Sequence, residues 1–206
     1  MNLYIVRHGE SVDAAAGMYQ RVDSGLSEVG LKQAEALAER LTRIKTDLIL
    51  ASPLARTKQT AEIVAKTLGK VVEYSDLFVE ERQPSGILGR SLMEPEVLQI
   101  RRQVRDNISD PSWRFSDEET FFDLRGRAVR ATNFLMNLEK DNVILVGHGA
   151  FTAMLLCVMW LSETVEPSIY RQFRDFFWDH NTGLTWCVCD GKKWKMLTWN
   201  DYAHLG

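Results

Sequence analysis

Short apolar runs alternate along the chain with stretches in which apolar residues repeat every three or four positions. The runs are typical of buried strands, and the repeats are typical of helices that cover a sheet. The predicted strands are residues 3–6, 47–51, 71–74 and 143–146, and the predicted helices are 28–44, 53–68, 116–138 and one that opens at about 150. The alternation predicts an α/β fold, a three-layer α/β/α sandwich with a mostly parallel central sheet.

Capping residues mark two of the helix starts. Ser52 followed by Pro53 predicts an N-cap with proline at the first helical position. Residues 116–119, Ser-Asp-Glu-Glu, fit a capping box before the long helix. Near the end of the chain, residues 178–182 are irregular, and two strands over 184–189 and 193–198 are joined by a hairpin at Asp190-Gly191.

Two segments lack a regular pattern. Residues 12–25 are predicted to form a loop. Residues 77–116 contain prolines and glycines, and their one helical stretch, 95–108, is rich in arginine. We interpret residues 77–116 as an insertion over the sheet, a small helical lid within a single domain that spans residues 1–206.

Composition narrows the classes of protein that fit. A chain of 206 residues, 45% hydrophobic and 26% charged, is an ordinary globular sequence that buries a sizeable core. The net charge of −3, without a basic block, argues against nucleic acid as a partner.

The three cysteines, the N-terminus and the longest apolar run indicate where the protein resides. Cys157, Cys187 and Cys189 lack the spacing of a disulfide framework, which indicates a reducing compartment. The N-terminus has no signal-peptide pattern, and the apolar run over 150–161 is too short to cross a bilayer. We therefore expect a cytoplasmic protein that does not contact a membrane.

Side chains suited to phosphate chemistry follow three of the predicted strands. Arg7-His8 comes directly after the first strand, Arg56 lies in the helix after the second, and His148 follows 143–146. Parallel strand ends meet at one edge of a sheet, where ligands bind. Guanidinium groups fork onto phosphate oxygens and an imidazole attacks phosphorus. Gly9 is expected to let the backbone approach the ligand closely.

Four motifs resemble one family when they are taken in order. They are Arg7-His8-Gly9-Glu10-Ser11, Ala-Ser-Pro-Leu-Ala-Arg-Thr-Lys-Gln-Thr-Ala over 51–61, Leu-Phe-Val-Glu-Glu-Arg over 77–82, and Val-Gly-His-Gly over 146–149. Together they cover nearly the whole chain and resemble the histidine phosphatase superfamily, which includes the phosphoglycerate mutases.

The resemblance implies a role for each matching residue. His8 is the nucleophile that becomes phosphohistidine. Arg7, Arg56, Gly149 and a protonated His148 hold the phosphoryl oxygens. The reaction needs no metal and no cofactor, because phosphoryl transfer asks mainly for positioning and charge stabilisation. The attacking nitrogen of His8 has to be neutral, so the other nitrogen should donate to a backbone carbonyl.

The general acid is one of two neighbouring glutamates. The family pattern of an apolar residue, any residue and a glutamate favours Glu80 over Glu81 as the group that protonates the leaving oxygen. This acid has to carry a proton before attack, which burial under the lid would favour.

Other positions depart from the family or stay open. Ala14 stands where many relatives have an asparagine, so one phosphate contact is missing or comes from another residue. Gln20, Arg21 and Asp23 are candidates to line the site. The lid arginines either bind an acidic or polyphosphorylated ligand or form a solvated face; they are Arg82, Arg90, Arg101, Arg102 and Arg105.

Hydrolysis of a small phosphorylated molecule, by a metal-independent phosphatase of the histidine acid phosphatase type, is the function we expect. A homodimer is compatible with this function. A phosphoglycerate mutase is the nearest alternative, although mutases of the family have a longer basic lid. A phosphate-binding scaffold with weak or no catalysis is another, suggested by Ala14.

Two further classes fit poorly. Gly147-His148-Gly149 has the start of a dinucleotide fingerprint, but Thr152 replaces its third glycine. Cys187, Cys189 and His180 lack the spacing of a zinc site.

Overall fold

The strands form one mixed sheet of six strands. A computed structural model describes residues 1–176 and 179–206. The strands are β1 (Asn2–Arg7), β2 (Leu48–Ala51), β3 (Val72–Tyr74), β4 (Asn142–Gly147), β5 (Leu184–Cys189) and β6 (Trp194–Asp201), in the order β3-β2-β4-β1-β5-β6. The first four are mutually parallel, and β5 runs antiparallel to both β1 and β6. The predicted mostly parallel sheet and the hairpin are confirmed.

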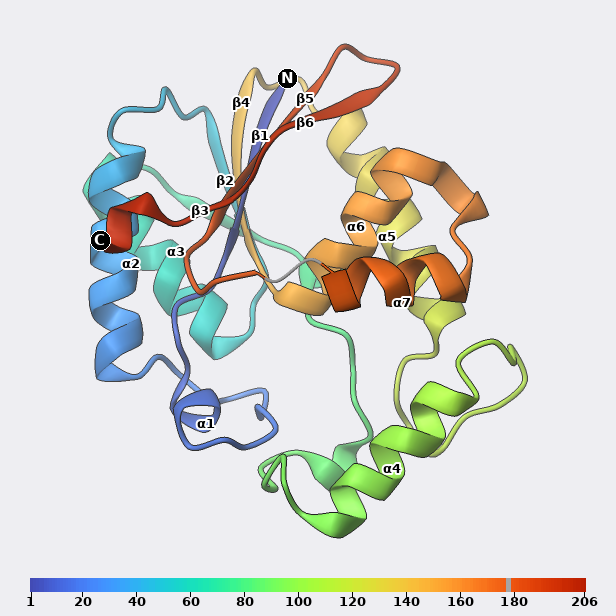
Figure 1. The fold of residues 1–206 in the computed structure, drawn as a ribbon. Coiled ribbons are helices and arrows are strands. Elements are labelled where there is room, and N and C mark those ends of the chain that lie inside the picture. The colour runs from blue at the N-terminus through green and yellow to red at the C-terminus, as the bar shows by residue number, and fades with distance from the viewer. Residues whose placement is uncertain (177–178) are drawn as a thin grey trace.

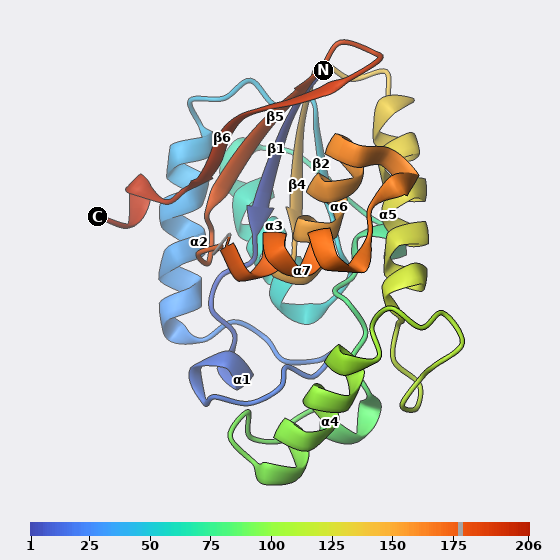
Figure 2. The same ribbon diagram turned by 45° about the vertical axis from the view of Figure 1, so that its right-hand side comes forward.

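Helices cover both faces of this sheet (Figures 1 and 2). The described α-helices are α1 (Val12–Ala15), α2 (Glu28–Leu41), α3 (Ala55–Leu68), α4 (Pro95–Asp106), α5 (Phe121–Met136), α6 (Gly149–Leu161) and α7 (Pro167–Phe176). Short 3-10 helices occupy Asp76–Phe78, Ser85–Ile87, Ser162–Thr164 and Ala203–Leu205. Helices α2 and α3 lie on one face, and α5, α6 and α7 lie on the other, which confirms the three layers.

The alternation of side chains along the strands divides the core in two. Tyr4 and Val6 of β1 pack with residues of α2 and α3. Leu3 and Ile5 of the same strand pack with residues of α5 and α6. Because successive side chains of a strand point to opposite faces, each inner strand contributes to both layers.

Both predicted helix starts were wrong by a few residues. Helix α3 begins at Ala55 and not at Pro53, and the hydroxyl of Ser52 contacts His148 as well as accepting from the Leu54 N–H. Helix α5 begins at Phe121, where the capping box is formed by Thr120 and Asp123.

Three other segments differ from the prediction or extend it. The predicted loop over 12–25 contains the one-turn helix α1. Helix α7 was not predicted, because only Pro167 and Tyr170 are buried within its polar sequence. The predicted irregular segment 178–182 begins at Trp178, which lies outside the described residues.

The segment between β3 and α5 extends beyond the carboxyl ends of the parallel strands (Figures 1 and 2). Helix α4 is its main element, and Val97 is the buried residue of that helix. Backbone hydrogen bonds tie this segment to the loop after α1, with the Tyr19 N–H donating to Arg90 at 2.9 Å and the Gly89 N–H donating to Tyr19 at 2.8 Å. Residues 77–116 are thereby held above the edge where the motifs meet.

The described helices include none with the length and apolar character that crossing a membrane requires.

Candidate active site

The three motif-bearing strand ends meet at one point of the sheet edge. Arg7 pairs with Gly147, and the His8 N–H donates to the Gly147 carbonyl at 3.0 Å. The Ser52 N–H donates to Val146 on the other side of β4. The rings of His8 and His148 lie 5.2 Å apart, and both are buried, as is Arg56. The predicted convergence of these side chains is confirmed.

Contacts on both ring nitrogens fix the orientation of His8. Its Nδ1 lies 2.7 Å from the Gly9 carbonyl oxygen, so Nδ1 carries the proton and donates it there. Its Nε2 accepts from the Arg56 Nε–H at 3.2 Å. Burial lowers the pKa of His8 well below its ordinary value, and the charges of nearby groups, Arg56 among them, add to the effect. His8 is therefore a neutral imidazole with its lone pair on Nε2.

Burial favours the neutral form of His148 as well, and a protonated His148 beside a bound phosphate stays a prediction. Burial lowers the pKa of His148 well below its usual range, and the charges of Arg56 and Arg7 lower it further. Its Nε2 lies 2.8 Å from the Ser52 hydroxyl and 3.0 Å from the Thr57 hydroxyl. Its Nδ1 is buried without a hydrogen-bond partner among the described residues.

The two hydroxyls that hold His148 were not anticipated. The Ser52-Pro53 pattern predicts a helix cap at Ser52, and Thr57 is the neighbour of Arg56 in the second motif. The position of Thr57 within that motif was the available signal.

Arg56 is buried in the first turn of α3. Besides the contact with His8, its Nη1 donates to the Arg21 carbonyl at 3.1 Å. Burial lowers the pKa of this guanidinium, but an arginine keeps its charge because its ordinary pKa is far above neutrality. The helix start places the charge where free backbone N–H groups also favour an anion.

Arg7 is held by a residue that the sequence did not single out. Its Nη1 donates to the Asp179 carbonyl oxygen at 2.5 Å and lies 3.5 Å from the Asp179 carboxylate. Burial raises the pKa of Asp179, and the charge of Arg7 opposes that rise. Arg7 Nε and Asp179 Oδ2 are buried without partners in the described part of the chain. The site thus keeps a guanidinium N–H available for an oxygen acceptor.

The two motif glycines have different reasons for lacking a side chain. A Cβ at Gly9 would lie 2.5 Å from the Gly30 carbonyl oxygen, so this glycine permits the close contact with α2, and its approach to a ligand stays a prediction. Gly149 is the first residue of α6, and a Cβ there would lie 2.8 Å from the Asp179 carboxylate.

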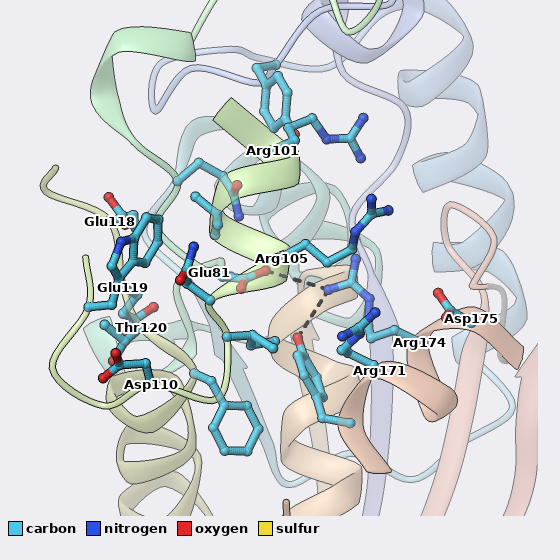
Figure 3. Close-up of a pocket in the computed structure, with 18 residues that line it drawn as sticks. Glu81, Arg101, Arg105, Asp110, Glu118, Glu119, Thr120, Arg171, Arg174 and Asp175 are labelled. Atoms are coloured by element: carbon cyan, nitrogen blue, oxygen red, sulfur yellow. Dashed lines mark hydrogen bonds and ion pairs between the residues drawn. The ribbon is translucent and has the colours of Figure 1, made fainter. Parts of the chain in front are cut away.

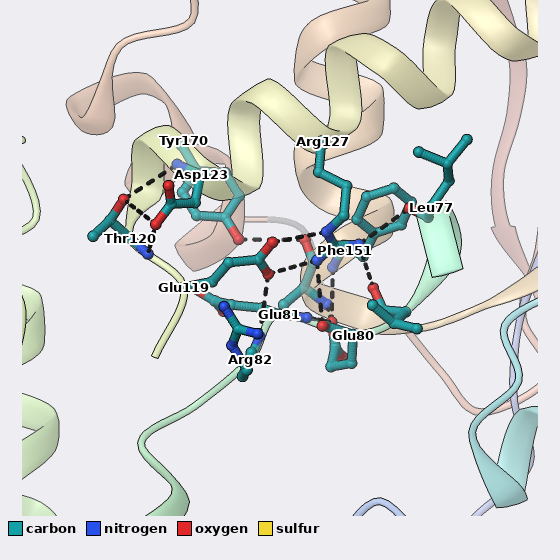
Figure 4. Close-up of polar contacts among 12 residues, drawn as sticks. Leu77, Glu80, Glu81, Arg82, Glu119, Thr120, Asp123, Arg127, Phe151 and Tyr170 are labelled. Atoms are coloured by element: carbon teal, nitrogen blue, oxygen red, sulfur yellow. Dashed lines mark hydrogen bonds and ion pairs between the residues drawn. The ribbon is translucent and has the colours of Figure 1, made fainter. Parts of the chain in front are cut away.

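Glu80 lies at the N-terminus of α6 (Figure 4). Its carboxylate accepts from the N–H groups of Phe151 at 2.9 Å, Ala150 at 3.3 Å and Glu81 at 2.8 Å. A helix N-terminus stabilises a negative charge. In this arrangement Glu80 has the contacts of a carboxylate, whereas the expected general acid has to carry a proton.

A buried arginine fixes the backbone before Glu80 (Figure 4). Arg127 of α5 donates to the carbonyl oxygens of Leu77 at 3.1 Å and Val79 at 2.7 Å, and it pairs with Glu119 at 2.6 Å. Its guanidinium also lies 4.5 Å from the ring centre of Phe151. Arg127 therefore positions Glu80 through the backbone.

Glu81 points to a different set of partners. Burial raises its pKa to about 7, while Arg174, 3.6 Å away, opposes that rise. A cavity of about 330 Å³ is lined by both glutamates together with Arg56, Gln20 and Arg21. Burial lowers the pKa of Arg56, and the charge of Glu80 opposes that effect.

Two of the candidates from the loop after β1 line this cavity. Gln20 accepts from the Ser11 hydroxyl at 2.9 Å, and Arg21 pairs with Asp13. Neither Asp23 nor Ala14 lines the cavity.

The lid arginines have different surroundings. Arg82 lines this cavity, and Arg101 and Arg105 line an adjoining one (Figure 3). Arg90 pairs with Glu94 and Glu96, and Arg102 lines neither cavity.

The cysteines and the candidate metal-ligating side chains form no further site among the described residues. Cys157, Cys187 and Cys189 are free and buried. Within residues 1–176 and 179–206, no group of three or more His, Cys, Asp or Glu side chains is placed to hold a metal ion.

Comparison with known families agrees with the site. The model of the histidine phosphatase superfamily, branch 1, matches residues 3–202. The chain belongs to this superfamily. As a histidine phosphatase superfamily member, it has the motif residues Arg7, His8, Arg56 and His148 together at the carboxyl edge of its sheet.

The proteins similar to this histidine phosphatase superfamily member are named either as phosphatases or as phosphoglycerate mutase-like proteins. It is 30% identical to a metal-independent phosphoserine phosphatase of Arabidopsis thaliana, over 98% of this chain and 82% of that protein. It is 27% identical to phosphoglycerate mutase-like protein 4 of the same plant, over 98% and 86%. A mycobacterial glucosyl-3-phosphoglycerate phosphatase shares the fold, with a TM-score of 0.79 at 24% identity over 97% of this chain and 98% of that one.

Proposed function

We propose that this protein hydrolyses phosphomonoesters through a phosphohistidine formed on His8. The observation that carries the proposal is the buried, neutral His8, with its Nε2 lone pair turned toward the guanidinium of Arg56. A neutral imidazole is a nucleophile, and a guanidinium beside it stabilises the charge that develops on the phosphoryl oxygens.

The first half-reaction forms a bond between His8 Nε2 and phosphorus while the bond from phosphorus to the ester oxygen breaks. For this step Arg56 turns its N–H groups from His8 to the phosphoryl oxygens, together with Arg7, His148 and the first turn of α6 at Gly149. The leaving oxygen takes a proton from the general acid. In the second half-reaction water gives that acid a proton and attacks phosphorus, and the bond to His8 breaks.

Glu80 is the general acid in this proposal. Its support is the cavity that it lines together with Arg56, and the electrostatic effect of its charge on the pKa of that arginine. The helix contacts of the carboxylate have to be exchanged before Glu80 donates a proton. A phosphate dianion beside a carboxyl group favours the protonated form, so substrate binding supplies that change. Glu81 is the alternative acid, supported by its raised pKa of about 7.

The substrate class is a small phosphorylated metabolite. The relatives named as a phosphoserine phosphatase and as phosphoglycerate mutase-like support both hydrolysis and phosphoryl transfer between substrates. Hydrolysis is favoured because Arg90 of the lid is already paired with Glu94 and Glu96. A mutase has to retain a bisphosphate. An arginine whose charge is already neutralised by two glutamates contributes little to binding a bisphosphate. A catalytically inactive scaffold lacks support, since Arg7, His8, Arg56 and His148 are all present.

A cytoplasmic location and a homodimer belong to the same proposal. Three free, buried cysteines support a reducing compartment. The exposed side chain of Trp160 supplies apolar surface for a second copy.

Release of inorganic phosphate is the test of the proposed activity. Wild-type protein is given phosphoserine, 3-phosphoglycerate and p-nitrophenyl phosphate, and phosphate is measured against a His8→Ala control. Hydrolysis of these esters by wild type alone supports the phosphatase. Phosphoryl exchange between phosphoglycerates, with little net release, would instead support the mutase. Neither reaction in wild type would contradict the proposal.

A further inference from the structure

The peptide group between Gly9 and Glu10 connects His8 to a glutamine on another element. The carbonyl oxygen of this peptide, which belongs to Gly9, accepts the Nδ1 proton of His8 at 2.7 Å. The N–H of the same peptide, which belongs to Glu10, donates to Oε1 of Gln33 in α2 at 2.8 Å. Because a peptide group is planar, the orientation of its N–H also sets the orientation of its carbonyl oxygen. The contact with Gln33 therefore bears directly on the contact with His8.

Two glycines allow α2 to come close enough for this contact. A Cβ at Gly9 would lie 2.5 Å from the Gly30 carbonyl oxygen, and a Cβ at Gly30 would overlap the carbonyl oxygen of Glu10. Either side chain would push the helix and the loop after β1 apart. Gln33 follows Gly30 by three positions, so both residues lie on the same face of α2. The close approach at the glycines thereby brings Gln33 within reach of the Glu10 N–H.

The same glycine makes a restraint on this peptide necessary. Gly9 has no Cβ, so rotation about its backbone bonds is hindered less than it would be in another residue. A rotation of the peptide that follows Gly9 would turn the carbonyl oxygen away from Nδ1 of His8. The hydrogen bond from the Glu10 N–H to Gln33 opposes this rotation, because the peptide would have to give it up as well.

The preceding peptide group, between His8 and Gly9, is held by two other elements. The His8 carbonyl oxygen accepts from Nδ2 of Asn181, in the segment before β5, at 2.9 Å. The Gly9 N–H donates to the hydroxyl of Thr60 in α3 at 3.2 Å. Both contacts act on the peptide before the Cα of Gly9, whereas the carbonyl that faces Nδ1 lies after it. The restraint of that carbonyl through its own peptide therefore comes from Gln33.

The orientation of the Gly9 carbonyl determines which nitrogen of His8 is the nucleophile. A neutral imidazole has a proton on one nitrogen and a lone pair on the other. A proton held on Nδ1 leaves the lone pair on Nε2, which faces Arg56. If the carbonyl turned away, part of the protein would have the proton on Nε2, and that nitrogen could not attack phosphorus. During attack the ring gains positive charge, so the hydrogen bond from Nδ1 to the carbonyl becomes stronger.

We propose that Gln33 is a positioning residue for the nucleophile, which holds the Gly9 carbonyl on Nδ1 of His8 and so keeps the lone pair on Nε2. The inference rests on the proposed function and deepens it, because it concerns the same phosphohistidine reaction. Gln33 acts through one peptide group and does not itself contact the substrate.

The first test measures the tautomer of His8 by NMR. The nitrogen chemical shifts of isotope-labelled histidine are recorded at a pH where the ring is neutral, and the His8 signals are those that disappear in His8→Ala. Wild type should give two widely separated shifts, as a single tautomer does. Gln33→Met keeps the size of the side chain but removes the oxygen acceptor, so the ratio of the two tautomers should change about fivefold and the two shifts should approach each other.

The second test measures activity and its rescue. In Gln33→Met, kcat/KM for p-nitrophenyl phosphate should fall about tenfold, because the bond that strengthens during attack is no longer held. Gln33→Glu keeps an oxygen acceptor for the Glu10 N–H and should restore both the tautomer and most of kcat/KM. Gln59→Met is the matched control, since Oε1 of Gln59 accepts from the Leu26 N–H at 2.6 Å and so holds a different part of the backbone. It should leave the His8 shifts in place.

The tautomer measurement needs no turnover, which separates this inference from the proposed activity. A changed tautomer in Gln33→Met supports the role of Gln33 whether or not wild type releases phosphate. Unchanged His8 shifts in Gln33→Met, folded by its thermal melt, would overturn it even if wild type is an active phosphatase. A loss that Gln33→Glu shares in full would overturn it as well. Gln33→Leu, which also lacks an acceptor, replaces Gln33→Met if that variant does not fold.

Discussion

Replacing Arg56 by alanine probes the centre of the proposed mechanism. Arg56 is buried, and its Nε–H lies 3.2 Å from the nitrogen that attacks phosphorus. In the transition state the same guanidinium would donate to phosphoryl oxygens in a site shielded from water. The loss of one such donor costs roughly 3–4 kcal/mol, so kcat/KM should fall by about 10²–10³. Arg56→Lys should recover little of it, because an ammonium cannot fork onto two oxygens.

The same variant should also change the pH dependence. Arg56 is one of the charges that lower the pKa of His8, after burial and His148. His8 attacks only when it is neutral, so activity is lost as pH falls through its pKa. Removing Arg56 raises that pKa and moves the acidic limb of the kcat/KM profile to higher pH.

The assay is kcat/KM for p-nitrophenyl phosphate between pH 4 and 8, with a thermal melt to verify folding. Lys58→Ala is the control, since Lys58 is an exposed residue of the same helix. A loss below about tenfold, which corresponds to roughly 1.4 kcal/mol, would refute the assignment of Arg56 to the phosphate. An acidic limb that stays in place would refute its electrostatic effect on His8.

Four further perturbations test separate parts of the proposed mechanism. Glu80→Gln should slow hydrolysis of alkyl phosphates far more than that of p-nitrophenyl phosphate, whose leaving group needs no proton; an equal loss would point to Glu81. EDTA should leave the rate unchanged and vanadate should inhibit, as phosphate release will show; inhibition by EDTA that one metal reverses would contradict the mechanism. Ser52→Ala removes a contact to His148 worth about 1 kcal/mol, so kcat/KM should fall about fivefold, and an unchanged value would assign Ser52 to folding alone.

The sequence predicted the meeting of the catalytic side chains because parallel strands end at the same edge of a sheet. Any parallel sheet places the ends of its strands along one edge, and β2, β4 and β1 are direct neighbours. Arg7 is the last residue of β1, Arg56 lies five residues after β2, and His148 lies one residue after β4. The shared direction of the strands places these residues at one edge, and the adjacency of the strands brings them together.

Contacts between segments that are distant along the chain could not be predicted from the sequence. Asp179 meets Arg7 across 172 positions, and the start of α6 meets Glu80 across about 70. Serine before proline is the pattern of a helix cap, and the same two residues also fit a serine whose hydroxyl contacts a buried histidine, as Ser52 does. The protonation state of His148 depends on burial, which the amino-acid sequence alone does not show.

A covalent phosphate on His8 is the most direct test of the proposed mechanism. Protein incubated with a labelled phosphomonoester is quenched, digested and analysed for phosphate that is labile in acid and stable in base. Wild type should carry this label on the peptide that contains His8, and His8→Ala, folded by its thermal melt, should carry none. Label that persists in His8→Ala, or turnover in wild type without phosphohistidine under rapid quench, would contradict the mechanism.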